Sequence, residues 1–290
     1  MGKETLVEII DRQQVVRGAA DVVQQPVREF LQQLGPAKDF LHGKWLGHAL
    51  HPVLTDIPVG AWTVALALDA AEMMSGEEGV GDAADLVVGI GLAGAVASAV
   101  TGLTDWSETD GRAKNVGIVH GVLNLAATGL YTASLISRRR KSSRQSGIAL
   151  SMLGYAVASF SAYLGGHLVF GEQVGVDHTA TADQNQPEKF TRVMRADDLQ
   201  ERKPVRVDME DRAVLLVRIG DRIHALTNTC PHLGGPLNEG KLEGDSIRCP
   251  WHGSRFCLTD GAVLDGPSTF DARVFDVRVR DGQIEVRARG

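Results

Sequence analysis

The chain is poor in cysteine, in aromatic residues and in positive charge. Only three cysteines occur among its 290 residues, aromatic residues make up 5%, and the formal net charge is −6. Three cysteines are too few for a disulfide scaffold, and the chain has no C-x-x-C-H sequence that would attach a c-type haem. The acidic balance argues against a nucleic-acid partner, because such partners need a basic surface. The first fourteen residues are charged and polar, so no cleavable signal peptide is predicted there.

Charge is absent from three long stretches of the chain. They cover Leu86–Leu103, Asn115–Ser137 and Gln145–Gly171, and a weaker fourth stretch covers Pro52–Met73, interrupted by Asp56, Asp69 and Glu72. A helix of about 20 apolar residues crosses the roughly 30 Å core of a bilayer. The many small residues would let such helices pack closely. Buried helices of a soluble protein are the alternative, but several such runs in close succession disfavour it. We therefore predict an integral membrane protein with a four-helix transmembrane bundle over residues 46–171.

Residues 1–45 have the pattern of an amphipathic helical segment. Apolar residues recur near helical spacing, at Leu6, Ile9, Ile10, Val16, Val22, Val23, Val27, Phe30 and Leu31. Pro26 is expected to kink or interrupt this helix, because proline removes a backbone donor and clashes with the preceding turn. We interpret the segment as a helix between solvent and bilayer.

Two short sequences combine cysteine with histidine: Cys230-Pro-His232 and, sixteen residues later, Cys249-Pro-Trp-His252. A [2Fe–2S] cluster needs four protein ligands, and two imidazoles in place of two thiolates on one iron raise its reduction potential. The two sequences would supply that set, with both cysteines on one iron and both histidines on the other. Proline and glycine in each sequence favour tight turns. A zinc site is the alternative, although zinc sites usually show C-x2-C or H-x3-5-H spacing.

Two stretches resemble the Rieske family: CPHLGGPLNEG, which begins at Cys230, and IRCPWHGSRFCLTDGAVLDGP, which ends at Pro267. The match covers roughly the last hundred residues. The resemblance implies an all-β antiparallel domain over residues 189–290. It assigns the cluster ligands to Cys230, His232, Cys249 and His252.

The sequence departs from the high-potential branch of that family, in which two further cysteines form a disulfide and a Ser and a Tyr donate hydrogen bonds to the cluster. Gly235 and Trp251 stand at the disulfide positions, Ser254 stands at the Ser position, and Phe256 replaces the Tyr. We expect a reduction potential below the quinol-oxidising type. The third cysteine, Cys257, is interpreted as a small buried side chain beside the cluster loop.

The segment from His51 to Trp62 resembles the opening of a bacterial family of predicted four-helix membrane proteins, and the resemblance covers roughly residues 40–172. That family implies no activity. Residues 172–188 are polar and lack an apolar period, so they are predicted to be the linker between the two domains.

Four histidines are expected near the same end of an up-and-down bundle: His48, His51, His120 and His167. Asp56 and Asp105 join them. Bundle cores are where histidine pairs bind haem or metal. Two of these histidines therefore form a candidate site for haem b, a metal ion or a quinone. The alternative is that they are interfacial residues bonded to backbone and lipid headgroups.

The charge of the loops bears on orientation in a bacterial cell membrane. Five cations lie in residues 138–144, against four on the opposite side at Lys38, Lys44, Arg112 and Lys114. This count favours a cytoplasmic 138–144 loop and an extracytoplasmic Rieske domain. The missing disulfide pair points the other way, because it suits a reducing compartment.

These features predict a membrane-anchored protein that transfers single electrons between a membrane donor, quinol or haem, and a redox partner protein. The alternatives are a ferredoxin-type donor to an oxygenase, with the bundle as an anchor, and a redox sensor. An oxygenase catalytic subunit is not expected. Such proteins carry a large iron domain after the Rieske domain, and this sequence leaves no room for one before Gly290. Whether the chain forms a homo- or hetero-oligomer is left open.

Overall fold

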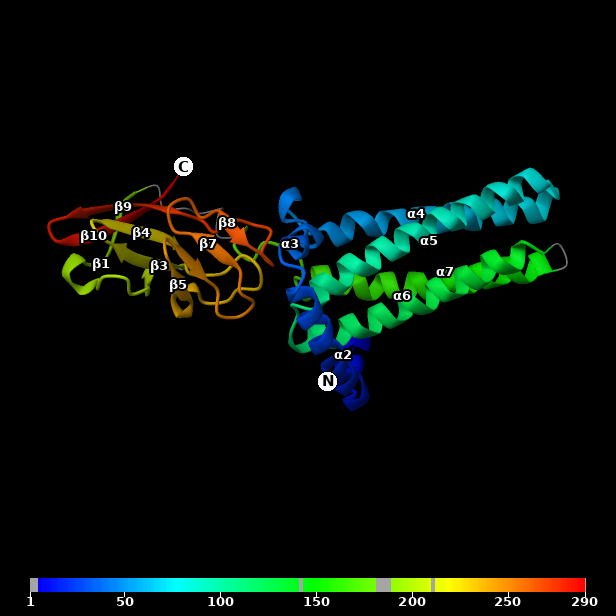
Figure 1. Cartoon of the computed structure of the whole chain (residues 1–290), viewed down its shortest axis with the longest axis horizontal. Coiled ribbons are helices and arrows are strands. Elements are labelled where there is room, and N and C mark those ends of the chain that lie inside the picture. Colours follow the sequence, from blue (N-terminus) through cyan, green and yellow to red (C-terminus); the bar gives the residue numbers. More distant parts are fainter. Residues whose placement is uncertain (1–4, 141–142, 181–188, 210–211, 290) are drawn as a thin grey trace. The chain divides into compact units, whose positions relative to one another are not determined.

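The computed structural model describes residues 5–140, 143–180, 189–209 and 212–289 (Figure 1). The chain divides into two compact units. One contains Met1–Leu41 and Ala49–Val174, and the other contains His42–His48 and Gly175–Gly290. The short segment 42–48 therefore belongs with the C-terminal unit, although it precedes the bundle in sequence. Part of the predicted linker, residues 181–188, lies outside the described residues.

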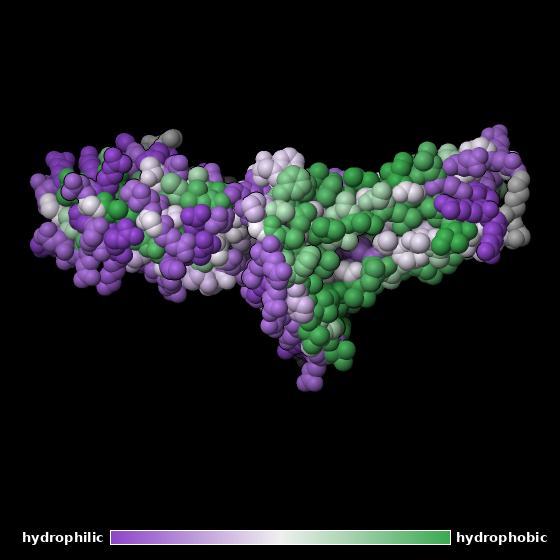
Figure 2. Space-filling model, in the orientation of Figure 1, coloured by the Kyte–Doolittle hydropathy of each residue, from purple (hydrophilic) through white to green (hydrophobic). Residues whose placement is uncertain are grey.

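The first unit contains four long apolar helices, which confirms the predicted transmembrane spans. These are α4 (Leu50–Ser75), α5 (Glu78–Trp106), α6 (Gly111–Arg138) and α7 (Arg144–Phe170). Gly76, with φ of 70°, ends α4 and leads into a short turn to α5. Figure 2 shows hydrophobic surface along these helices and hydrophilic residues at the end where α4 meets α5. An apolar exterior of this kind is what a lipid-facing bundle requires.

Helices α4 and α6 carry the same residues at the same spacing, a repeat that the sequence analysis missed. The sequence His51-x-Val-Leu-x5-Gly-x2-Thr-x2-Leu66 in α4 recurs as His120-x-Val-Leu-x5-Gly-x2-Thr-x2-Leu135 in α6. Helices α5 and α7 share a second pattern, Gly-x-Ala-x-Ala-x2-Ser-Ala-x2-Gly, which begins at Gly91 and at Gly154. The bundle is therefore a duplicated helical hairpin, α4–α5 followed by α6–α7.

The repeat brings equivalent residues of α4 and α6 together inside the bundle. Trp62 and Tyr131 occupy matching positions, and their rings stack with centroids 4.1 Å apart. Glycines of the partner helices leave room for these rings, since a Cβ on Gly91 would lie 2.3 Å from Trp62 and one on Gly154 would lie 3.0 Å from Tyr131. The contact joins the two hairpins across the core.

A buried ion pair forms the next matched layer. Arg138 donates to both carboxylate oxygens of Asp69, and the side chains are 0% and 2% exposed. Ser134, Ser151 and Asp85 also contact the guanidinium group. A charged pair at membrane depth is tolerated only when it is paired and hydrogen-bonded in this way.

Two of the five cations in residues 138–144 form ion pairs with carboxylates of the bundle. Arg138 lies inside the bundle, and Arg144 pairs with Glu72 and Asp85. Lys141 lies outside the described residues. On the opposite side Lys38 pairs with Glu108, and Arg112 pairs with Glu172.

The N-terminal segment forms α1 (Leu6–Arg12), α2 (Gln14–Gln32) and α3 (Pro36–His42). Pro26 does not end α2, so the expected interruption there is wrong. The breaks lie instead at Gln13, which is extended, and near Gly35, with φ of 53°. Gln24 of α2 donates to the carbonyl oxygens of Trp106 and Thr109, and thereby caps the end of α5.

The second unit is an all-β antiparallel domain, as predicted. Its described residues form ten strands in three sheets. The first contains β1 (Thr191–Arg195), β10 (Gln283–Ala288) and β9 (Phe275–Arg280). The second contains β2 (Val205–Met209), β3 (Arg212–Ile219) and β4 (Arg222–Thr227), and the third contains β5 (Lys241–Glu243), β6 (Ser246–Arg248), β7 (Arg255–Cys257) and β8 (Val263–Asp265). One hydrophobic core lies against the third sheet and contains the buried side chains of Cys230 and Cys249 beside Leu237, Ile247 and Phe256.

Candidate iron–sulfur centre

Two loops with the same backbone structure carry the cysteine and histidine residues. The first follows β4 and the second joins β6 to β7. In the first, Gly234 N–H donates to the Cys230 carbonyl at 2.9 Å, and Cys230 N–H donates to the Gly235 carbonyl at 2.8 Å. In the second, Gly253 N–H donates to the Cys249 carbonyl at 3.2 Å, and Cys249 N–H donates to that of Ser254 at 2.8 Å.

Glycine is required at the fourth residue after each cysteine. Gly234 and Gly253 have φ of 81° and 80°, values that other residues rarely adopt. The matching turns explain why C-P-H-L-G-G and C-P-W-H-G-S fold alike, although the histidine sits one residue later in the second loop.

The two cysteine side chains meet in the interior of the domain. Their thiols are hydrogen-bonded to each other, and this bond lowers the pKa of Cys249 to about 7 and raises that of Cys230. The backbone N–H groups of the following residues, His232 and Leu233 in one loop and Trp251 and His252 in the other, donate to the thiols and favour the thiolate form. Converging amides of this kind stabilise sulfur that carries negative charge.

The two histidines lie together at the edge of the same site. The rings of His232 and His252 have centroids 5.0 Å apart and planes at 82°, and both residues are half-buried. Two imidazoles bound to one tetrahedral metal at about 2.0 Å have ring centres about 5 Å apart. The described residues place no three His, Cys, Asp or Glu side chains around a single ion. Two separate pairs, one of sulfur and one of nitrogen, fit a two-iron cluster better than one zinc ion.

A close packing contact occupies the positions where the high-potential branch has its disulfide. A Cβ on Gly235 would lie 2.9 Å from Cys249 Sγ and 3.1 Å from the Trp251 ring. The two loops are therefore joined by backbone-to-indole packing rather than by a covalent bond.

Ser254 presents a buried hydroxyl group next to the second loop. Its Oγ accepts a hydrogen bond from the Ser268 N–H at 2.9 Å, and the side chain is 0% exposed. Among the described residues no protein group accepts the proton of this hydroxyl. A cluster sulfur is the acceptor that the donor set of this site would supply. Phe256 is fully buried in the core and has no hydroxyl to offer.

Cys257 lies on β7 and is half-buried. Its side chain hydrogen-bonds the carboxylate of Asp260, which lowers the pKa of that acid.

Arg248 holds the second loop from outside. Its Nη1 donates to the Gly253 carbonyl at 2.8 Å, while Glu243 and Asp265 pair with the rest of the guanidinium group. Arg255 and then Arg248 lower the pKa of Asp265. The loop is thus tied to a network that requires ionised carboxylates.

The described part of the predicted linker also supports the site. His178 N–H donates to the Pro231 carbonyl at 3.0 Å, and Thr179 is buried. Residues 175–180 therefore pack as part of the second unit and hold the first loop.

The four bundle histidines do not share one environment. His51 and His120 lie together, with ring centroids 6.5 Å apart. His167 bonds Glu172 at 3.1 Å, and His48 precedes α4 in the segment that belongs to the second unit. Asp56 lies within α4 and Asp105 lies near the end of α5.

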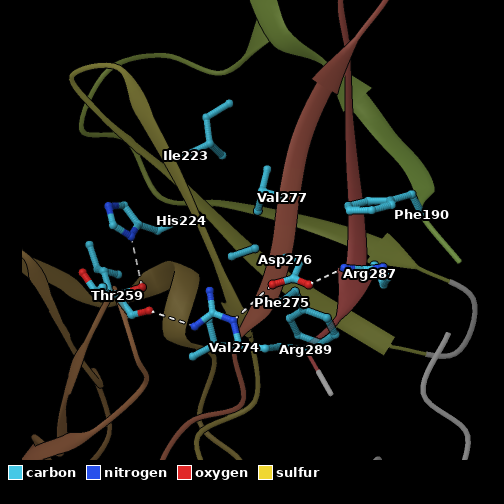
Figure 3. A pocket seen from close by; sticks show the side chains of 12 residues that line it. Phe190, Ile223, His224, Thr259, Val274, Phe275, Asp276, Val277, Arg287 and Arg289 are labelled. Atoms are coloured by element: carbon cyan, nitrogen blue, oxygen red, sulfur yellow. Dashed lines mark hydrogen bonds and ion pairs between the residues drawn. The ribbon is translucent and has the colours of Figure 1, made fainter. Parts of the chain in front are cut away.

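A separate cavity of about 370 Å³ lies on the β-domain between β4, β9 and β10 (Figure 3). Asp276 lies in its wall between Arg287 and Arg289 and pairs with both. None of the residues of the two loops lines it. Both arginines of the lining are held by Asp276, and we assign no ligand to this cavity.

Comparison with known families matches both parts of the chain. Residues 189–276 match the Rieske [2Fe-2S] domain, and residues 47–178 match a family described as predicted membrane protein (DUF2231). The cofactor expected from the sequence, a [2Fe–2S] cluster, is therefore confirmed at the level of the domain.

Relatives with known roles cover the Rieske part. Ferredoxin CarAc of Metapseudomonas resinovorans is 38% identical over 98 residues, which is 33% of this chain and 92% of that protein. The anthranilate 1,2-dioxygenase ferredoxin subunit of Burkholderia cepacia is 32% identical over 90 residues, 31% of this chain and 83% of that protein. Among solved structures, the ferredoxin of carbazole 1,9a-dioxygenase from Nocardioides aromaticivorans IC177 is 31% identical, with coverage of 35% and 99% and a TM-score of 0.33.

Proposed function

The chain belongs to the Rieske [2Fe–2S] family, and from that premise we propose that it is a membrane-anchored one-electron carrier whose cluster is held by Cys230, Cys249, His232 and His252. The observation that carries this proposal is the pair of loops with matching backbone hydrogen bonds, which bring two thiols and two imidazoles together. The four long apolar helices hold this domain at a membrane.

The cysteines and the histidines of the site have different roles. The bound cluster supplies reversible one-electron chemistry. Cys230 and Cys249 are buried, so they exclude water from one side of the site, and the amides of the loops stabilise their negative charge. His232 and His252 are half-buried, so their outer edges are the surface at which an electron donor or acceptor would make contact.

Substitution of the ligands tests this assignment. Purified Cys230→Ser is expected to lose most of its iron and acid-labile sulfide, while Cys257→Ser keeps both, because Cys257 faces Asp260. His252→Cys would lower the midpoint potential, since a thiolate adds negative charge to the cluster. A His252→Cys protein with an unchanged potential would show that His252 is not a ligand.

We propose that the electrons come from a donor in the membrane and pass to a soluble redox protein. The membrane helices support the first half. The relatives support the second half, since one is named as the ferredoxin subunit of a dioxygenase and this chain covers 83% of its length. A ferredoxin-type donor to an oxygenase is the second candidate, in which the bundle serves only as an anchor.

The midpoint potential distinguishes a quinol donor from the ferredoxin role. A potential near that of quinones favours quinol oxidation, and a value near the low end of the Rieske range, about −150 mV, favours the ferredoxin role. Phe256, which lacks a hydroxyl donor, and the absence of a disulfide between the loops support the lower value.

The side of the membrane that the Rieske domain faces stays a prediction. The charge count favours the extracytoplasmic side. Protease added to intact spheroplasts would cleave the chain within residues 172–188 if this is right. Protection of that segment, with cleavage after lysis, would place the domain in the cytoplasm.

A further inference from the structure

The duplicated hairpins carry one histidine site each, and the first is built around His51 near the start of α4. Its Nδ1 lies 2.9 Å from the carbonyl oxygen of Ser98 in α5. The imidazole rests directly on Gly102, where a Cβ would lie 2.7 Å from the ring. The ring is therefore held at its Nδ1 edge by a neighbouring helix that has no side chain beneath it.

His120 in α6 has the same surroundings. Its Nδ1 lies 2.8 Å from the carbonyl oxygen of Ser161 in α7. A Cβ on Gly165 would lie 3.0 Å from the imidazole. Serine and glycine stand four residues apart in both α5 and α7, so the repeat preserves the complete site and not only the histidine.

These contacts set the protonation of both rings. A carbonyl oxygen can only accept, so Nδ1 carries a proton in each histidine, and in the neutral ring the lone pair then belongs to Nε2. A histidine that donates from one nitrogen to a backbone carbonyl is arranged to bind metal through the other. Asn124, one turn along α6, donates to Nε2 of His120 at 3.0 Å, and rotation of this one amide would release that nitrogen.

The separation of the two rings fits one metal between them. The centroids lie 6.5 Å apart, with the planes at 86°. Two imidazoles on opposite sides of one metal, each bound at about 2.0 Å, have ring centres about 6 Å apart. The 5.0 Å separation of His232 and His252 instead suits two neighbouring corners of one tetrahedral iron.

The number of ligands identifies the kind of metal. In the described part of the chain no third His, Cys, Asp or Glu joins His51 and His120. A zinc ion would need three or four ligands from the protein. Haem supplies four nitrogens of its own and needs only axial ligands. The two histidines come from different hairpins, which pack tightly within themselves and less closely against each other.

We propose that His51 and His120 are the axial ligands of a haem b bound between the hairpins α4–α5 and α6–α7. The iron would gain and lose one electron without covalent change. The site deepens the proposed function, because such a haem is a membrane donor suited to a one-electron carrier, but haem binding does not require the cluster. It also lies at the bundle end where α7 finishes.

Binding of hemin to the purified full-length protein in detergent tests the proposal. Wild type is expected to take up one hemin per chain, with the spectrum of six-coordinate low-spin haem and a sharp band in the reduced-minus-oxidised difference spectrum. His51→Ala and His120→Ala should each weaken binding at least tenfold or leave a five-coordinate, high-spin species. Gly102→Ala, which pushes a methyl group into the His51 ring, should weaken it as well.

His167→Ala is the matched control, because His167 belongs to the same bundle end but bonds Glu172. It should bind hemin as wild type does. The Rieske signal in electron paramagnetic resonance and the helical circular dichroism show whether each variant is folded. Cys230→Ser should lose the cluster and keep the hemin, so failure of one site is distinguishable from failure of the other. Uptake that is not near one per chain, or that persists in the His51→Ala/His120→Ala double variant, would overturn the proposal.

Discussion

Removal of the Ser254 hydroxyl should lower the reduction potential of the cluster. The side chain is fully buried, its Oγ is occupied by the Ser268 N–H, and its proton has no protein acceptor among the described residues. A hydrogen bond to a charged group contributes about 1.5–3 kcal/mol. Reduction adds one negative charge to the cluster. If about half of this energy, about 0.8–1.5 kcal/mol, distinguishes the two states, Ser254→Ala lowers the potential by about 30–65 mV, since 59 mV corresponds to a tenfold change for one electron.

The assay is a potentiometric titration of the purified protein, followed by electron paramagnetic resonance of the reduced cluster. Ser246→Ala is the matched control. Ser246 is another buried serine, in strand β6 before the second loop, but its hydroxyl donates to the Glu243 carbonyl at 2.6 Å, so its loss should leave the potential unchanged. Iron content must stay near that of wild type, because Ser254→Ala also deprives Ser268 N–H of its acceptor. An intact cluster in Ser254→Ala with an unchanged or raised potential would refute the reasoning.

Three further outcomes follow from the packing and charges. Arg138→Met should destabilise the bundle by about 3–5 kcal/mol, because it leaves the Asp69 carboxylate buried without its partner. Asp69→Leu in the same chain should restore most of the lost stability. Unfolding in sodium dodecyl sulfate, followed by circular dichroism, measures the stability of both variants, and equal stability of the single and double variants would contradict the prediction. Gly235→Ala should lower the iron content per chain, because its Cβ meets the Cys249 sulfur; full occupancy would show that the loops can separate without losing the cluster. The pKa of Asp265 is held below its usual value by Arg255. The stabilisation from this ion pair is therefore complete above about pH 4, the unfolded pKa, and is lost as the pH falls through the lower folded pKa. Acidification of wild type should release the cluster in a step over that pH range, the step should be missing in Asp265→Asn, and identical acid profiles would argue against this.

The cluster site could be predicted from sequence because its determinants are local. Each cysteine, its proline and its glycine four residues later specify one turn, and the hydrogen bonds of that turn close within six residues. The transmembrane helices were predictable for a related reason, since the length of an apolar run alone matches the thickness of a bilayer. The effect of Pro26 was not predictable in this way, because α2 is also held by contacts that Gln24 makes with the bundle.

The bundle histidines needed the tertiary structure. His48, His51, His120 and His167 appear equivalent when only span ends are counted, yet the rings of His51 and His120 lie next to each other while His167 bonds Glu172. The signal that could have separated them is the repeat of α4 in α6, which is spread over nineteen residues from His51 to Asp69 and again from His120 to Arg138. Asp69 and Arg138 occupy equivalent positions of the repeat but carry opposite charges, which makes the repeat harder to recognise in the sequence.

The two histidine–cysteine sequences alone therefore determined the kind of cofactor, because a thiolate–imidazole donor set and its turns are encoded within a few residues. The long uncharged runs likewise determined that the chain is a membrane protein. Only the tertiary structure decided which side chains face one another: Gly235 against Trp251 at the cluster, and His51 against His120 in the bundle. The reason is that helix phase and hairpin packing, which no short segment specifies, decide which distant residues come within contact distance.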